Sequence, residues 1–232
     1  QQATTAKAVV EAKADFGIAW DGDFDRCFFY DQNGRFIEGY YLVGLLAEQL
    51  LKKSPKSAIV HDPRLEWNTI EKVQAHGGKA VVCKCGHSFI KDKMREQDAV
   101  YGGEMSAHHY FRDFFYCDSG MIPWLLLVEL LSQDSRSLSQ VVDQCMLDFP
   151  CSGEINFTIA NAKEAIARVQ QHYANQSHQL STLDGISMEF AQWRFNLRSS
   201  NTEPVVRLNV ETRANSTLLA EKVAELKGLL VG

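Results

Sequence analysis

Long apolar segments are missing from this sequence of 232 residues. A helix that crosses a bilayer needs about 20 consecutive apolar residues, and no run in the sequence approaches that length. The polar residues 1–7 also lack the regions that define a signal or transit peptide. We therefore expect no membrane partner and a cytoplasmic location.

An excess of positive charge is missing too. Lys and Arg total 24 against 29 Asp and Glu, which gives a formal net charge of -5 at pH 7. Proteins that bind nucleic acids neutralise backbone phosphates with clustered Lys and Arg. We expect no nucleic-acid partner.

Proline and cysteine are scarce, with 5 and 6 residues, and the 15 glycines follow no repeat. This composition excludes collagen-like chains, low-complexity disorder and small scaffolds held by dense disulfides. Hydrophobic residues make up 45% of the sequence, which is enough for two small domains with buried cores. We expect a globular chain in which the cysteines stay as thiols.

Residues 1–147 alternate between short apolar runs and helical patterns. Runs typical of buried strands cover residues 16–20, 26–30, 57–61, 79–83 and 99–101. Apolar residues at helical spacing cover residues 4–13, 40–53, 65–76, 88–96, 120–131 and 138–146. Asn33-Gly34 predicts a hairpin turn, and residues 102–119 are predicted to form a long loop. The alternation predicts an α/β fold of three layers, in which helices cover both faces of a mixed, mainly parallel sheet.

The pattern changes after residue 147. Strand patterns cover residues 154–159, 186–190, 192–197 and 205–211, and helical patterns cover residues 162–173 and 216–230. Adjacent strands flanked by helices predict a small α+β domain with an antiparallel sheet. We expect boundaries that divide the chain into residues 1–35, 36–147 and 148–232.

Three carboxylates follow the first apolar run, at Asp21, Asp23 and Asp25. On an extended backbone a spacing of two brings them to one side, where a hard divalent cation would offset their repulsion. A calcium hand does not fit, because its sixth loop position is Arg26 and its twelfth is Gln32. We favour a cation site over a solvated acidic turn, and a phosphatase-type nucleophile at Asp21 stays open.

Other stretches carry groups that suit anions or sugars. Arg-Ser-Ser-Asn-Thr-Glu-Pro at residues 198–204 offers a guanidinium, hydroxyls, an amide and turn N–H groups for a phosphate, although it also suits a plain hairpin turn. Gly-Glu-Met-Ser-Ala-His at residues 103–108 follows a predicted strand end, where ligands gather in such sheets. Gly86-His87-Ser88 opens a predicted helix, whose free N–H groups can bind an anion.

These motifs, in this order and spacing, resemble those of the phosphohexomutase superfamily, and most closely those of its bacterial phosphomannomutases. Residues 21–26 resemble the family's magnesium loop, residues 103–108 its sugar-binding loop and residues 198–204 its phosphate-binding loop. The resemblance covers nearly the whole chain. It implies that residues 1–35 end the second mutase domain, residues 36–147 form the third, and residues 148–232 form the C-terminal phosphate-binding domain.

One family motif has no counterpart in the sequence. The family carries its catalytic phosphoserine in a Thr-x-Ser-His-Asn-Pro-like loop of the first domain. The single Ser-His pair here, Ser177-His178, lies in Gln-Ser-His-Gln and lacks the neighbouring residues of that loop. The resemblance therefore identifies the chain as a C-terminal part of such an enzyme, which we expect to be inactive alone.

The resemblance implies that the complete enzyme interconverts mannose 1-phosphate and mannose 6-phosphate through a hexose 1,6-bisphosphate and a phosphoserine. Mg²⁺ would bind to Asp21, Asp23 and Asp25, while Arg26 would neutralise the transferring phosphoryl group. His108 would carry a proton to or from the reacting hydroxyl. The implied sugar-binding residues are Glu104, Ser106, His87 and Arg64. The implied phosphate-binding residues are Arg198, Ser200, Asn201, Thr202 and Arg207, although a strand arginine paired with a surface acid is an equally open role for Arg207.

Several functions stay open at this point. A hexose phosphate is the expected partner, but mannose and glucose differ at one hydroxyl that no residue reads uniquely, so glucose- and glucosamine-type mutases are alternatives. A magnesium-dependent phosphatase and a non-catalytic phosphosugar-binding module are others. The sequence does not indicate the oligomeric state.

Overall fold

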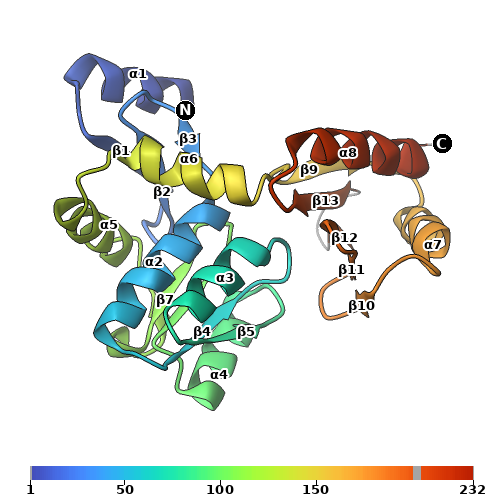
Figure 1. Cartoon of the computed structure of the whole chain (residues 1–232), viewed down its shortest axis with the longest axis horizontal. Coiled ribbons are helices and arrows are strands. Elements are labelled where there is room, and N and C mark those ends of the chain that lie inside the picture. Colours follow the sequence, from blue (N-terminus) through green and yellow to red (C-terminus); the bar gives the residue numbers. More distant parts are fainter. Residues whose placement is uncertain (1, 201–204, 232) are drawn as a thin grey trace. The chain divides into compact units, whose positions relative to one another are not determined.

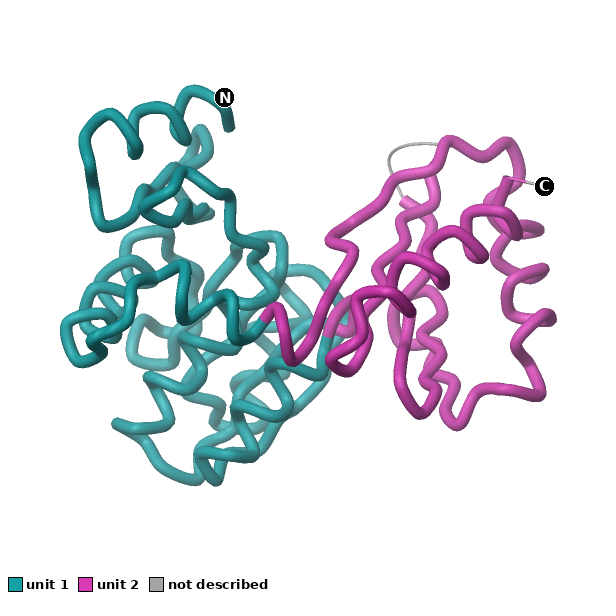
Figure 2. The backbone as a smooth tube through the Cα atoms, turned by 45° about the horizontal axis from the view of Figure 1, so that its top comes forward, with its two compact units in different colours: residues 1–62, 66–145 teal, residues 63–65, 146–232 magenta. Residues whose placement is uncertain are grey.

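The computed structural model describes residues 2–200 and 205–231. Figure 1 shows its helices and strands, and Figure 2 its two compact units. Unit 1 comprises Gln1–Asp62 and Glu66–Cys145, and unit 2 comprises Pro63–Leu65 and Met146–Gly232. The three-part division at residues 35 and 147 stays a prediction.

Unit 1 begins with helix α1 (Gln2–Ala12) and the strands β1 (Phe16–Trp20), β2 (Cys27–Asp31) and β3 (Phe36–Ile37). The strands form an antiparallel sheet in the order β1-β2-β3. Gly34 turns the chain between β2 and β3 with φ of 77°, which confirms the predicted hairpin. Helix α1 contacts β1 where Val9 lies against Gly17.

A second sheet of unit 1 contains β4 (Ala58–His61), β5 (Lys79–Val82), β6 (Tyr101–Gly103), β7 (His109–Phe111) and β8 (Cys117–Asp118), in the order β5-β4-β6-β7-β8. Strand β4 pairs in parallel with β5 and β6, whereas β7 pairs antiparallel with β6 and β8. The sheet is therefore mixed, as predicted. The prediction of a loop over residues 102–119 is wrong, because Tyr110 and Phe111 are buried in β7 and a 3₁₀ turn (Arg112–Phe114) leads on to β8.

Helices cover both faces of this sheet. They are α2 (Gly39–Lys53), α3 (Trp67–Ala75), α4 (His87–Gln97) and α5 (Ile122–Gln133). Helix α6 (Leu138–Asp148) instead contacts the β2–β3 turn, where Gln32 Nε2 donates to Ser139 Oγ at 2.6 Å. Ile59 of β4 packs in a cluster with apolar residues of α2, α3 and α5, such as Leu46, Val73 and Leu126. Its neighbours Ala58 and Val60 pack in a second cluster with Ile90 and Met94 of α4. Since adjacent strand residues face opposite sides, the predicted three layers are confirmed.

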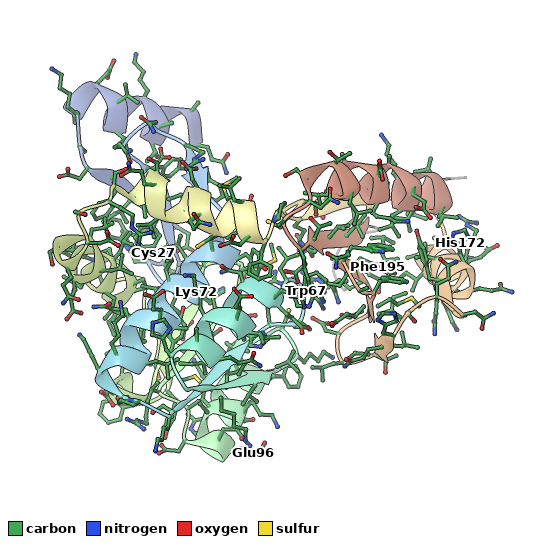
Figure 3. All side chains as sticks on the ribbon, viewed as in Figure 1. Cys27, Trp67, Lys72, Glu96, His172 and Phe195 are labelled. Carbon is green, nitrogen blue, oxygen red and sulfur yellow. The ribbon has the colours of Figure 1, made fainter. Side chains whose placement is uncertain are left out.

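Unit 2 is built on a five-stranded antiparallel sheet in the order β10-β11-β12-β13-β9. The strands are β9 (Ile155–Thr158), β10 (Gln179–Ser181), β11 (Ile186–Glu189), β12 (Trp193–Ser199) and β13 (Val205–Thr212). Helices α7 (Ala162–Tyr173) and α8 (Ser216–Val231) supply Val169, Tyr173 and Leu226 to its core. Phe195 of β12 lies in that core, while His172 stands on α7 beside it (Figure 3). The antiparallel α+β domain is therefore confirmed, although the sequence did not predict the polar strand β10.

Two further expectations concern single features. All six cysteines are free thiols, as expected. In the described part of the chain, no helix combines the length and the apolar character that a membrane span requires.

Candidate functional site

The acidic turn, which we define as Asp21, Asp23 and Asp25, joins β1 to β2. Each residue offers a carboxylate oxygen, and these oxygens all lie within 4.8 Å of one another. The backbone is not extended as expected. Phe24 has φ of 62°, and its N–H donates to Asp21 O at 3.4 Å, so a turn brings the carboxylates together. The three carboxylates lie together as predicted, but a turn of the backbone, and not an extended strand, brings them there.

Arg26 holds the first carboxylate of the acidic turn. Its backbone N–H donates to Asp21 Oδ1 at 3.2 Å, and its Nε donates to Asp21 Oδ2 at 2.6 Å. Burial alone would raise the pKa of Asp21, but these hydrogen bonds and the guanidinium charge outweigh it and lower the pKa to about 2. Asp21 is therefore ionised at neutral pH.

For Asp25 the net effect on the pKa is the opposite, an increase. Burial is the largest effect and raises the pKa of Asp25; His108 opposes it, and Asp21 and Asp23 raise the pKa further. Asp25 Oδ1 is buried and accepts no hydrogen bond from the described residues, and Arg26 Nε lies 3.8 Å away. A carboxylate oxygen in this condition would be satisfied by a bound cation.

His108 lies beside the acidic turn, where it forms an isolated antiparallel bridge with Arg26. Its Nδ1 is 3.5 Å from Asp25 Oδ2 and 3.5 Å from Asp118 Oδ2. Lys91 Nζ contacts the other oxygen of Asp118 at 2.9 Å. Lys91 and Asp118 were not predicted as site residues. Asp118 belongs to β8, within the stretch predicted to be a loop, and Lys91 follows no motif.

Glu104 is buried and links the predicted sugar-binding loop to the start of α4. Its Oε2 accepts a hydrogen bond from Tyr110 Oη at 2.8 Å, and its Oε1 accepts one from Gly86 N at 3.0 Å. The next residue along the chain donates its N–H to Asp62 Oδ2 at 2.7 Å, so the loop is anchored at two points. His87, which follows Gly86, is exposed.

The remaining residues of this loop differ in exposure. Ser106 is half-buried, and Ala107 has φ of 73°, which turns the chain back toward β7. His109 is fully buried and lies 2.6 Å from Tyr101 Oη through its Nδ1. Burial lowers the pKa of His109 to about 3, so its ring is neutral and structural.

Unit 2 contains a cluster of arginines around one carboxylate. The arginine cluster comprises Arg64, Arg198 and Arg207, with Glu154 between them. Arg198 Nη2 donates to Glu154 Oε2 at 3.0 Å, Arg64 Nη1 lies 3.8 Å from the same oxygen, and Arg207 Nη1 lies 3.6 Å from Oε1. Arg198 and Arg207 are direct cross-strand partners on β12 and β13. The structure thus brings three predicted ligand-binding residues together.

Two predicted phosphate-binding residues, Asn201 and Thr202, lie outside the described residues. Ser200 is described, and its N–H donates to Val205 O at 2.9 Å. Arg64 was expected among the sugar-binding residues, but in the structure it lies with Arg198 and Arg207, for which phosphate binding was predicted.

A buried ion pair explains how Arg64 reaches this cluster. Arg194 Nη1 contacts Glu211 Oε1 at 2.8 Å, and both side chains are fully buried. The same guanidinium donates to Pro63 O at 2.9 Å and to Arg64 O at 3.1 Å, which fixes the segment Pro63–Leu65 to unit 2. The sequence analysis missed Glu154, Arg194 and Glu211. Arg194 and Glu211 are cross-strand partners, a relation that only the register reveals.

Fold and side chains define a mixed α/β chain with an acidic, cation-suited turn in unit 1 and an anion-suited arginine cluster in unit 2. Two family models match it: phosphoglucomutase/phosphomannomutase, alpha/beta/alpha domain III, over residues 38–149, and phosphoglucomutase/phosphomannomutase, C-terminal domain, over residues 154–228. The chain therefore belongs to the phosphohexomutase superfamily, as its motifs predicted.

Named relatives agree with this assignment. A protein of Xanthomonas campestris pv. campestris named "Phosphohexose mutases" is 65% identical over 98% of this chain and 51% of its own length. A phosphomannomutase of Vibrio cholerae is 60% identical over 99% of this chain and 50% of its own length. The chain thus spans about half the length of the curated relatives it matches.

Solved structures share the fold. A phosphoglucomutase/phosphomannomutase family protein of Burkholderia thailandensis matches with a TM-score of 0.83 and 27% identity, over 99% of this chain and 50% of its own. An N-acetylphosphoglucosamine mutase of Aspergillus fumigatus, solved in complex with GlcNAc-6P and magnesium, matches in fold alone, with a TM-score of 0.64 and 13% identity over 92% of this chain and 51% of its own.

Proposed function

We propose that this chain is the C-terminal half of a phosphomannomutase that interconverts mannose 1-phosphate and mannose 6-phosphate through a hexose 1,6-bisphosphate. The observation that carries the proposal is the meeting of the acidic turn with Arg26 and His108. Carboxylates of the kind that bind a metal, a guanidinium and an imidazole that can carry a proton lie together, as transfer of a phosphoryl group requires. Relatives named phosphomannomutase at about 60% identity support the choice of substrate class.

The acidic turn fits Mg²⁺, because Mg²⁺ prefers carboxylate oxygens and Asp25 Oδ1 has no hydrogen bond from the described residues. Asp21, Asp23 and Asp25 would hold the ion. When bound, Mg²⁺ would supply positive charge next to the transferring phosphoryl group.

Arg26 and His108 have separate roles in this proposal. Arg26 uses its Nε to hold Asp21, and its Nη groups neutralise charge on the phosphoryl oxygens. Asp25 and Asp118 lie 3.5 Å from Nδ1 of His108, which makes no hydrogen bond to the described residues, and Nε2 of His108 carries the proton to or from the reacting hydroxyl.

Each unit contains residues with a proposed role in substrate binding. Glu104 and Ser106 accept sugar hydroxyls, since each oxygen of the buried Glu104 carboxylate accepts a hydrogen bond from the protein and can accept a second. His87 joins them from the start of α4. Arg198, Ser200 and Arg207 bind phosphate together with Asn201 and Thr202, and Arg64 contributes to the same cluster.

A coupled assay for conversion of mannose 1-phosphate to mannose 6-phosphate tests this function. The chain alone should stay at background, because the phosphoserine that donates the phosphoryl group is absent from it. A longer protein that includes the N-terminal half should turn over with Mg²⁺ and stop when EDTA removes the metal.

The same assay tests the acidic turn by substitution. Asp23→Asn in the longer protein should bring turnover close to background, because it removes a metal-binding charge at nearly constant shape. Asp113→Asn, at a side chain that is 94% exposed, should leave turnover unchanged. Reproducible turnover by the chain alone after repurification, or full turnover by the Asp23 variant, would contradict the proposal.

The alternative of a phosphatase with Asp21 as nucleophile is less well supported. Both oxygens of Asp21 accept hydrogen bonds from Arg26, and a carboxylate with its pKa lowered to about 2 is a poor nucleophile. Burst release of phosphate from a generic ester would favour this alternative. The expectations of a cytoplasmic location and of no nucleic-acid partner stay predictions.

A further inference from the structure

We propose that Glu154 lowers the positive charge of the arginine cluster. We also propose that the substrate phosphate replaces the Glu154 carboxylate as the partner of the guanidiniums in the cluster. Glu154 is in this sense a positioning residue, which acts on phosphate through the arginines. The inference rests on the proposed phosphate-binding role of Arg198.

Glu154 contacts all three arginines of the cluster. Both of its oxygens are used: Oε2 by Arg198 at 3.0 Å and Arg64 at 3.8 Å, and Oε1 by Arg207 at 3.6 Å. Its position is fixed, because Ile155, the next residue, is the first of β9 and pairs with Leu208 of β13. Arg207 lies directly before Leu208, so the pairing of β9 with β13 positions both Glu154 and Arg207.

The arginine cluster carries more positive than negative charge. Three guanidiniums and one carboxylate carry a net charge of +2, and a phosphate monoester at neutral pH carries about -1.5 to -2. The net positive charge of these four groups therefore attracts a phosphate monoester even with Glu154 present. With a neutral residue at this position the cluster would carry +3 and would hold phosphate more tightly.

Arg198 also has a donor available for a ligand. Its Nε is buried and makes no hydrogen bond to the described residues, while its side chain is only 16% exposed. An unsatisfied buried donor is costly, and a phosphate oxygen is a strong acceptor for it. A phosphate that accepts from Nε also competes for Nη2, which Glu154 holds in the structure. The carboxylate and the phosphate are thus alternative partners for one guanidinium.

Titration of inorganic phosphate into this chain by calorimetry tests the inference. Glu154→Gln keeps the shape of the side chain and removes its charge, so the dissociation constant should fall about tenfold. Glu154→Asp keeps the charge, and its affinity should stay near that of the wild type. Glu221→Gln, at an exposed position of α8, removes the same charge away from the cluster and should change the affinity less than twofold.

The outcomes distinguish the role of Glu154 from that of the phosphate clamp, by which we mean the proposed phosphate-binding residues Arg198, Ser200, Asn201, Thr202 and Arg207. Unchanged or weaker phosphate binding by Glu154→Gln, with a native amide NMR spectrum and with Arg198→Ala still weaker than the wild type, would overturn the role of Glu154 alone. No phosphate binding by the wild type, or equal binding by wild type and Arg198→Ala, would overturn the clamp and the inference together. Equal tightening by Glu154→Gln and Glu221→Gln would show a general charge effect and would also overturn the inference.

Discussion

Replacement of Arg198 by Ala should weaken the binding of mannose 6-phosphate to this chain by about tenfold or more. The side chain is only 16% exposed, and Arg198 lies near the end of β12 as the first residue of the predicted phosphate-binding loop. Hydrogen bonds to charged groups contribute about 1.5 to 3 kcal/mol each, and about 1.4 kcal/mol corresponds to a factor of ten in affinity. The loss of one guanidinium contact is therefore measurable by calorimetry.

Three further variants define the cause of that loss. Arg198→Lys should recover only part of the affinity, because an ammonium keeps the charge but not the planar pair of donors. Lys163→Ala removes one positive charge from an exposed position of α7, and Ser199→Ala changes the neighbouring side chain. Both should bind as the wild type does. Unchanged affinity in Arg198→Ala would remove Arg198 from the clamp.

The replacement of Arg194 by Met should destabilise unit 2 by about 3 to 5 kcal/mol. Glu211 is fully buried, and the substitution leaves its carboxylate without the guanidinium that contacts it at 2.8 Å. It also removes the donors to Pro63 O and Arg64 O. Hydrogen exchange of the β12 and β13 amides should show the loss, and urea denaturation of the whole chain should show an earlier transition.

A double variant and a surface control complete this test. Arg194→Met combined with Glu211→Leu should recover much of the stability, because the double variant removes the buried carboxylate together with its guanidinium. Arg136→Met breaks a pair with Asp134 in which Arg136 is 53% exposed, and it should cost no more than about 1 kcal/mol. If Arg194→Met costs no more than this control, the pair does not hold unit 2 together.

Much of the fold could be predicted because its signals are local. The apolar run around Ile59 marks a buried strand, and Asn33-Gly34 marks a hairpin, without reference to distant residues. The run around Ile18 also marks a strand, but the prediction that this strand is buried is wrong, because Gly17 is its one buried residue. Strands β7, β8 and β10 were missed because they have two or three residues each, too few to show a period. For β10 the exposed side chains also remove the apolar signal.

Some residues of the candidate site could also be predicted from local sequence, and others could not. Asp21, Asp23 and Asp25 could be selected because their spacing is visible in one stretch, although the turn at Phe24 that joins them was not expected. Glu154 could not be selected, because its contact to Arg198 joins residues that are 44 apart in sequence and depends on the register of β9 with β13. Polar residues of strands, such as Arg194, resemble solvated positions until the fold buries them.

The central claim is that this chain recognises the phosphate group of a hexose phosphate, and amide NMR shifts of the wild-type chain test it most directly. Mannose 6-phosphate should shift the amides of Arg198 to Ser200 and of Arg207, with an affinity that falls as salt rises. Mannose at the same concentration should leave these amides in place, because exposed sugar hydrogen bonds alone are readily replaced by water. Equal shifts with both sugars, or shifts that avoid the arginine cluster, would contradict the account.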